Sequence, residues 1–284
     1  MTNNVFPPLA HELLASAYPE TVVTLPHKLC EHPLLTLTSL VDLATSLPSD
    51  TVEYNLGKLP IGIDPKDVPA PTLSIAETIA SIENNGSWMV IKFIENDARY
   101  KALLNETLEE LKPIVQSRTG NMISLQGFIF VSSPNAVTPF HFDPEHNILL
   151  QIRGNKVMTV FPASDEGIAP PEAHESFHRG EHHRNLVWHD DFAAHGTPFA
   201  LGPGQAIHVP VKSPHWVKNG DAVSISLSVT WRSDWSYAEA DARGFNHILR
   251  TRGIDPVSPG RFPARNLGKS IAYRGLRRLG MIGV

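Results

Sequence analysis

The sequence has a single cysteine, Cys30, among its 284 residues. One thiol can form neither a disulfide within the chain nor a cysteine-rich zinc site, so both are excluded. The sequence also lacks any apolar run near the ~18 residues that a membrane-spanning helix needs. Its first residues lack the basic and apolar segments of a secretory leader. We therefore expect an intracellular, cytoplasmic protein that does not enter a membrane.

Charged residues are also modest in number, at 19% of the chain, and they give a net charge of −5. This balance argues against bulk non-specific affinity for nucleic acid, and no helix-turn-helix or zinc-finger pattern is evident. The exception is the segment from Pro256 onward, which has no acidic residue and six basic ones: Arg261, Arg265, Lys269, Arg274, Arg277 and Arg278. A basic tail of this kind is more typical of a solvated face or a dimer contact than of a nucleic-acid site.

Histidine is abundant, with six of the fourteen histidines in residues 174–195. Residues 174–178 read HESFH, which matches the H-E-x-x-H pattern of zinc metalloproteases. In those enzymes the two histidines bind zinc from one face of a long, embedded helix. Here Pro171 precedes the motif and Gly180 follows it, so a helix is little more than two turns long. We therefore interpret the motif as a loop near a substrate entrance and not as a protease site.

The predicted secondary structure changes near residue 120. Residues 1–120 mix helical and strand patterns, whereas the residues that follow form short segments rich in β-branched and aromatic residues. The later segments are MISLQGFIFVS, HNILLQIRG, KVMTVFP, QAIHVPV, HWVK and AVSISLSVTW. Short strands separated by Gly, Pro and Asn predict a double-stranded β-helix, or jelly roll. We expect a mainly β fold with α additions: a mixed α/β region at 1–120 packed on a jelly-roll core at 121–235 with an insert at 162–203, then a helical segment and basic tail at 236–284.

The segment 223–231 predicts a strand with one polar and one apolar face. Its alternating residues are Ser224, Ser226, Ser228 and Thr230 on one face, and Val223, Ile225, Leu227 and Val229 on the other. The hydroxyl-bearing face either lines a wet cavity or is an ordinary solvent-facing surface of a sandwich. The alternation alone favours neither interpretation.

The segment 138–161, TPFHFDPEHNILLQIRGNKVMTVF, contains His141 and Asp143 two positions apart. On a strand these two side chains point to the same face, so the imidazole and the carboxylate converge. A third ligand must come from another strand, and His215 opens one after a proline-containing turn. Two histidines and one carboxylate suit non-haem Fe(II), whereas a closed structural zinc site uses four protein ligands.

Several neighbouring residues have open interpretations. Lys156 has the parity to project into the same cavity, where a buried lysine would need an anionic partner such as a dicarboxylate; the alternative is a surface lysine in a Gly-Asn-Lys turn. His208 is an alternative ligand or, as we expect, a cavity residue on the site-facing side. His146 has the wrong parity for the metal and is expected to be peripheral. Trp231 is opposite in parity to Thr230, so we expect it to face outward, against added helices or a partner.

Residues 120–235 resemble the JmjC, or cupin-like (cupin 8 type), Fe(II)/2-oxoglutarate-dependent oxygenases. The resemblance is strongest to small JmjC protein hydroxylases such as the asparaginyl hydroxylase that inhibits hypoxia-inducible factor. The segment QIRGNK and the segment GPGQAIHVP followed by PHWV match the family's motifs. The matching residues are Thr138, His141, Asp143, Asn147, Lys156 and His215.

The resemblance implies an Fe(II)- and 2-oxoglutarate-dependent oxygenase that uses O2 and releases succinate and CO2. His141, Asp143 and His215 would bind the metal. The cosubstrate carboxylate would be bound by Lys156 and Thr138, with Asn147 nearby and Thr230 as a weaker match.

The resemblance also implies a protein or peptide substrate hydroxylated on a side chain, and a homodimer formed through C-terminal helices. A small-molecule 2-oxoglutarate oxygenase and a catalytically idle regulatory module are the alternatives. Nothing in the sequence identifies the substrate or separates hydroxylation from demethylation.

Overall fold

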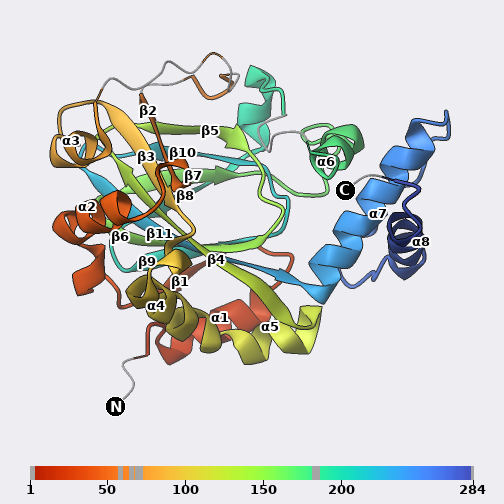
Figure 1. Cartoon of the computed structure of the whole chain (residues 1–284), viewed down its shortest axis with the longest axis horizontal. Helices are drawn as coiled ribbons and strands as arrows, with labels where there is room; N and C mark the ends of the chain where they lie inside the picture. The colour runs from red at the N-terminus through yellow and green to blue at the C-terminus, as the bar shows by residue number, and fades with distance from the viewer. Residues whose placement is uncertain (1–3, 57–59, 64–66, 68–72, 181–185, 283–284) are drawn as a thin grey trace.

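Two antiparallel β-sheets form the centre of the protein in the computed structural model, which describes residues 4–56, 60–63, 67, 73–180 and 186–282 (Figure 1). The larger sheet has the strand order β1-β9-β6-β11-β4-β3-β2, and the smaller one has the order β5-β10-β7-β8. The strands are β1 (Val23–Pro26), β2 (Val52–Leu56), β3 (Ser87–Lys92), β4 (Met122–Ser132), β5 (Val137–His141), β6 (His146–Arg153), β7 (Lys156–Val160), β8 (Thr197–Leu201), β9 (Gln205–Val209), β10 (His215–Asn219) and β11 (Ser224–Ser233).

The described α-helices fall into three groups along the sequence. Five precede β4, one lies between β7 and β8, and two follow β11. They are α1 (Pro8–Ala17), α2 (Leu37–Ser46), α3 (Ile75–Ala80), α4 (Ala98–Glu109), α5 (Lys112–Thr119), α6 (Pro171–Phe177), α7 (Asp234–Arg250) and α8 (Leu267–Arg278). The predicted mainly β fold with helical additions is confirmed. Within the described residues, no helix is both long and apolar enough to cross a bilayer.

The two sheets pack face to face through one cluster of apolar side chains. Leu149 and Ile207 come from the larger sheet, and Met158 and Val217 come from the smaller one. Alternate residues on these strands point into the space between the sheets, as the strand period of two requires. The other end of that space is lined by polar side chains, and it holds the candidate site.

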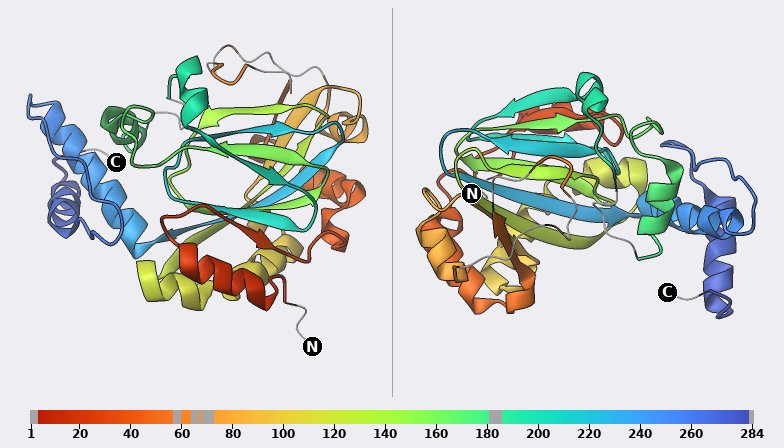
Figure 2. Two further views of the ribbon diagram at one scale, coloured as in Figure 1. Left: turned by 180° about the vertical axis from the view of Figure 1, so that it is seen from behind. Right: turned by 90° about the horizontal axis from the view of Figure 1, so that it is seen from above.

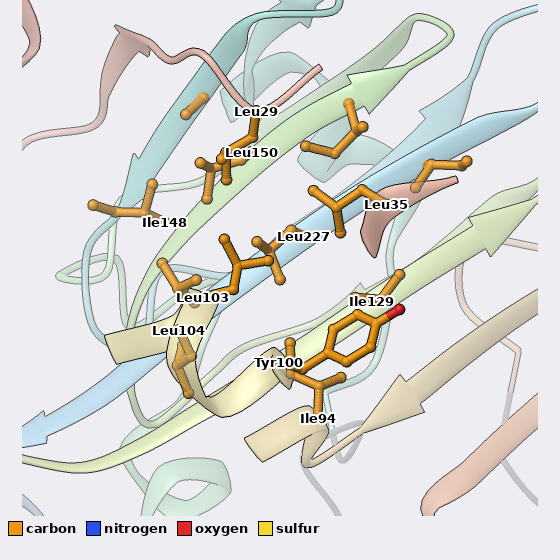
Figure 3. Close-up of a cluster of buried hydrophobic side chains, with 14 of the residues drawn as sticks. Leu29, Leu35, Ile94, Tyr100, Leu103, Leu104, Ile129, Ile148, Leu150 and Leu227 are labelled. Atoms are coloured by element: carbon orange, nitrogen blue, oxygen red, sulfur yellow. The ribbon is translucent and has the colours of Figure 1, made fainter. Parts of the chain in front are cut away.

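The outer face of the larger sheet is covered by the N-terminal helices. Figure 3 shows Leu103 and Leu104 of α4 in one apolar cluster with Ile129, Ile148 and Leu227 of the sheet. The apolar face of β11 belongs to this layer, so its hydroxyl-bearing face points between the sheets. The interpretation of residues 223–231 as a strand lining a cavity is therefore confirmed for Ser228 and Thr230.

The larger sheet takes three of its strands from the N-terminal region, because β1 pairs with β9 and β2 and β3 extend the sheet beyond β4. The predicted insert at 162–203 also contains β8, which pairs with β7 in the smaller sheet. The sequence did not predict β8, which contains Pro198. Proline is tolerated there because β8 is an edge strand, where one side of the backbone needs no partner.

The C-terminal helices α7 and α8 pack on each other at the side of the two sheets (Figure 2). They approach closely at Gly244, where an added Cβ would lie 2.5 Å from the Tyr273 ring. Asp241 of α7 accepts hydrogen bonds from Ser270 and Arg274 of α8. Part of the basic tail is therefore a packed helix with an acidic partner.

Candidate active site

The residues His141, Asp143 and His215 lie together at one end of the space between the sheets. His141 of β5 and His215 of β10 are directly paired across the smaller sheet, and their ring centroids are 4.3 Å apart. Asp143 follows β5, with Oδ1 3.9 Å from His141 Nε2 and Oδ2 3.7 Å from His215 Nε2. One ligand atom from each residue lies within 4.8 Å of the others, a spacing that suits one metal ion.

The two histidines are oriented by backbone carbonyl groups. His141 Nδ1 lies 2.7 Å from the carbonyl oxygen of Pro139, and His215 Nδ1 lies 3.0 Å from that of Ser213. A carbonyl oxygen only accepts hydrogen bonds, so each Nδ1 carries the proton and each Nε2 carries the lone pair. Both Nε2 atoms face the Asp143 carboxylate, which is the arrangement that metal-binding histidines require.

A cavity of about 300 Å³ opens beside this cluster and reaches Lys156 of β7. Lys156 is buried, and burial lowers the pKa of its ammonium group to about 7. Among the described residues, no acceptor lies within hydrogen-bonding or ion-pairing distance of its Nζ atom. A buried cation without a counter-charge is costly, so the cavity suits an anionic ligand. Lys156 is not the surface lysine of the alternative interpretation.

The other predicted cosubstrate residues also line this cavity, though their contacts differ. Thr138 lies on β5 beside the histidines, and Thr230 lies on β11, where its hydroxyl donates to the Gln126 carbonyl over 3.3 Å. Asn147 of β6 donates from Nδ2 to Asp143 Oδ2 over 3.0 Å. The structure thus brings all seven predicted site residues to one cavity, and it places Asn147 in contact with a metal-ligand candidate.

The expectation that His208 faces the site is wrong. Its neighbours Ile207 and Val209 point between the sheets, so His208 points outward, with Nδ1 3.1 Å from the Thr21 carbonyl oxygen and the ring against Tyr18. His208 and His215 lie on β9 and β10, which belong to different sheets, so strand alternation does not relate the faces of these two residues.

His146 lies outside the metal cluster, as predicted, but it is buried and not peripheral. Its ring stacks on Trp231, with centroids 5.3 Å apart, and its Nε2 lies 2.9 Å from the Ser233 hydroxyl. Trp231 points away from the cavity, as predicted, into the layer beneath the N-terminal helices.

The HESFH segment forms most of α6, a seven-residue helix, and it lies beside the cavity. Phe177 lines the cavity, whereas Glu175 pairs with Arg250 of α7 over 2.9 Å. His174 is buried against Phe142. The glutamate of the apparent protease motif therefore joins two helices. The motif is helical and not the predicted loop, but it does lie beside the cavity, which Phe177 lines.

Two groups of residues at the site were not predicted. The cavity wall opposite the smaller sheet includes Trp88 of β3 and Phe128 and Phe130 of β4. Lys212, in the turn before β10, donates its backbone N–H to the Asp143 carbonyl over 2.8 Å and pairs through its side chain with Glu239 of α7. No local sequence pattern signals either group, because both depend on contacts between distant segments.

In a comparison with known protein families, residues 74–236 match the cupin-like domain. This segment is more than half of the 284 residues and contains the whole metal cluster. The chain belongs to the cupin-like domain family. The predicted resemblance is therefore confirmed at the level of the family, and the cupin-like domain begins within the N-terminal region, before β3.

Solved structures of the Escherichia coli protein YcfD are similar to this member of the cupin-like family. One has a TM-score of 0.51 at 17% identity and is matched over 95% of this chain and 67% of its own. Another, described as a ribosomal oxygenase in complex with cobalt and 2-oxoglutarate, has a TM-score of 0.48 at 17% identity, over 95% of this chain and 66% of its own. The chain spans about two thirds of the YcfD length, and at this identity the likeness is one of fold.

Proposed function

We propose that this cupin-like protein is an Fe(II)- and 2-oxoglutarate-dependent oxygenase that hydroxylates a protein side chain. The observation that carries the proposal is Lys156, a buried ammonium group directed into the cavity that the two histidines and Asp143 border. A cupin that uses a metal without a 2-oxo acid has no reason to bury a lysine there.

The residues that line the cavity fit both Fe(II) and 2-oxoglutarate. Two imidazole nitrogens and one carboxylate make a facial set of three ligands, which leaves other positions on Fe(II) open. Lys156 can pair with the distal carboxylate of 2-oxoglutarate, and the Thr138 hydroxyl can donate to the same group. The metal, when bound, supplies the activation of O2. The protein residues orient the cosubstrate and keep water from the reacting carbon.

The overall reaction consumes one 2-oxoglutarate and one O2 and replaces one C–H bond of the substrate with C–OH. Succinate and CO2 carry away the remaining oxygen atoms, so the atoms balance. Trp88, Phe128 and Phe130 form an aromatic wall of the cavity, against which an apolar part of a substrate can pack.

The test is succinate formation from 2-oxoglutarate with Fe(II), ascorbate and O2. We expect turnover by the wild type, loss of turnover in Asp143→Ala, and a large rise in the KM for 2-oxoglutarate in Lys156→Met. Lys218→Met is the matched control, because Lys218 lies on the neighbouring strand β10 and is exposed. Equal KM values for the two lysine variants would refute the role of Lys156.

The substrate class has its own test. A cell extract is incubated with enzyme, 2-oxoglutarate and ¹⁸O2, and ¹⁸O is then located by mass spectrometry. We expect one ¹⁸O atom on a protein side chain with the wild type and none with Asp143→Ala. Label in small metabolites alone would favour the small-molecule alternative, and no label together with no succinate would favour the idle module.

Self-association through the C-terminal helices also stays a proposal. Most of α7 is buried within the chain, whereas α8 exposes Leu267 and Ile271. We therefore infer that a dimer would use α8. A monomeric mass in solution would contradict this.

A further inference from the structure

Asp143 differs from the two histidines in how it is held. The histidines lie on strands β5 and β10, and backbone carbonyl groups orient both rings. Asp143 lies in the turn between β5 and β6, and 27% of its side chain is exposed. Its orientation therefore depends on side-chain contacts.

The side-chain hydrogen bond to this carboxylate comes from Asn147, whose Nδ2 donates to Asp143 Oδ2 over 3.0 Å. On the other side of the amide, the Ser228 hydroxyl donates to Asn147 Oδ1 over 2.8 Å. Ser228 and Asn147 are both buried. Two linked hydrogen bonds thus connect Ser228 of β11 through Asn147 of β6 to Asp143 in the turn.

The donor and acceptor of each of these two hydrogen bonds follow from the chemistry of the carboxylate. An ionised carboxylate only accepts hydrogen bonds, so the NH2 group of the Asn147 amide must face Asp143. The amide oxygen then faces Ser228, whose hydroxyl can donate to it. Rotating the amide by half a turn would place its oxygen against the carboxylate, which is repulsive. Ser228 therefore favours the one amide orientation that holds Asp143.

A second serine–amide pair lies on the same two strands, β11 and β6. Its serine also donates to the amide oxygen, but its amide does not contact a metal-ligand carboxylate. Ser226 donates to Gln151 Oε1 over 2.7 Å, as Ser228 does to Asn147. The Gln151 amide nitrogen then contacts the carbonyl oxygens of Arg153 and Gly154, 2.6 and 2.9 Å away. This pair ties down the turn after β6, so it offers a matched control within the same sheet.

We propose that Asn147 and Ser228 are positioning residues that orient the Asp143 carboxylate for metal binding. This inference rests on the proposed metal site, and it gives Asn147 a role other than its implied place near the cosubstrate. Loss of a hydrogen bond of this kind behind a metal ligand lowers metal affinity by roughly 10- to 100-fold.

The experiment measures Co(II) binding to the metal-free protein by its visible absorption, which reports ligand geometry directly. We expect Asn147→Ala to weaken Co(II) binding 10- to 100-fold and to change the spectrum. Ser228→Ala has a smaller effect in the same direction because it acts through Asn147, and Ser228→Thr, which keeps the hydroxyl, restores wild-type binding. Ser226→Ala binds Co(II) as the wild type does.

The affinity of the Co(II)-loaded protein for 2-oxoglutarate separates the two roles of Asn147. Unchanged Co(II) affinity and spectrum in both Asn147→Ala and Ser228→Ala would overturn the inference, and a weakened 2-oxoglutarate affinity in that case would assign Asn147 to the cosubstrate. Absence of Co(II) binding by the wild type would instead overturn the proposed function itself. Thermal unfolding of the metal-free variants confirms that each one is folded.

Discussion

Lys212 and Glu239 form a fully buried ion pair between the turn before β10 and helix α7. Burial alone would raise the pKa of Glu239, but Lys212 and Arg243 together hold it well below its ordinary range. Lys212 has a positive φ of 64°, and its backbone N–H contacts the Asp143 carbonyl. Helix α7 lies almost wholly beyond the cupin-like match, yet it supports the turn behind the metal cluster.

The first prediction concerns this pair. Glu239→Ala leaves two buried cations without their partner, and we expect a loss of about 3–5 kcal/mol in the free energy of unfolding. Lys212→Met should cost less, because Glu239 keeps Arg243, whose Nε donates to it over 2.7 Å. Urea denaturation measures both. A larger loss for Lys212→Met than for Glu239→Ala would contradict this account.

The second prediction is a pH dependence of cosubstrate binding. The charged form of Lys156 binds a carboxylate, and burial lowers its pKa to about 7 in the unliganded cavity. Above pH 7 an increasing fraction of Lys156 is neutral, so binding must also take up a proton. The Kd for 2-oxoglutarate should therefore rise by about tenfold per pH unit above 7.

Calorimetric titration of the Mn(II)-loaded protein between pH 6.5 and 8.5 measures this dependence, together with proton uptake from the buffer. The Lys156→Arg variant is the control, since arginine stays charged throughout this range. A pH-independent Kd for the wild type would show that Lys156 does not pair with the cosubstrate.

The third prediction concerns acid stability. Burial lowers the pKa of His146 and His174 well below 6.5 and that of His208 to about 4. In the unfolded chain each histidine titrates near 6.5, so below that pH the unfolded state binds protons that the folded state rejects. Stability should fall as the pH drops, by about 1.4 kcal/mol per buried histidine at pH 5.5 relative to pH 7.5.

Urea denaturation at pH 7.5 and 5.5 measures the third prediction. His208→Gln removes one titrating group, so the difference in unfolding free energy between the two pH values should shrink by about 1.4 kcal/mol. An unchanged difference would show that His208 is protonated in the folded state.

The fourth prediction tests the packing of α7 on α8. Gly244→Ala puts a methyl group 2.5 Å from the buried Tyr273 ring, so the helices must separate, and we expect a loss of about 1–3 kcal/mol. Gly268→Ala is the control, because nothing lies within 4 Å of its added Cβ and alanine is the better helix former. It should be neutral or stabilising by up to about 1 kcal/mol. Equal destabilisation by both variants would contradict the predicted close approach.

The sequence was most informative where one strand carries its own signal. The alternation of residues 223–231 is local, and the structure has the same faces. His141 and Asp143 do meet at one site, but β5 ends at His141, so the turn and not the predicted strand brings Asp143 there. His215 and Lys156 were candidates from their strand positions, and only the family resemblance joined them to the first two as one set. All of these lie in one cavity because the strands that carry them face the same space.

The remaining features depend on contacts between distant segments. His208 was misplaced because a turn moves the chain from one sheet to the other, which resets the parity. The hydrogen bond from Asn147 to Asp143 depends on the shape of the turn after β5, and the pair of Lys212 with Glu239 depends on where α7 returns. Spacing along the chain constrains none of these three.

The pairing of β1 with β9 has a consequence for how the protein is made. Val23 lies opposite His208, so during synthesis β1 leaves the ribosome well over a hundred residues before its partner β9. Closing so long a loop is slow, since its entropy is lost before the pairing is gained. Until β9 is made, Leu25, which is buried in the finished fold, lacks its partners from the sheet, and transiently exposed apolar surface of this kind favours aggregation.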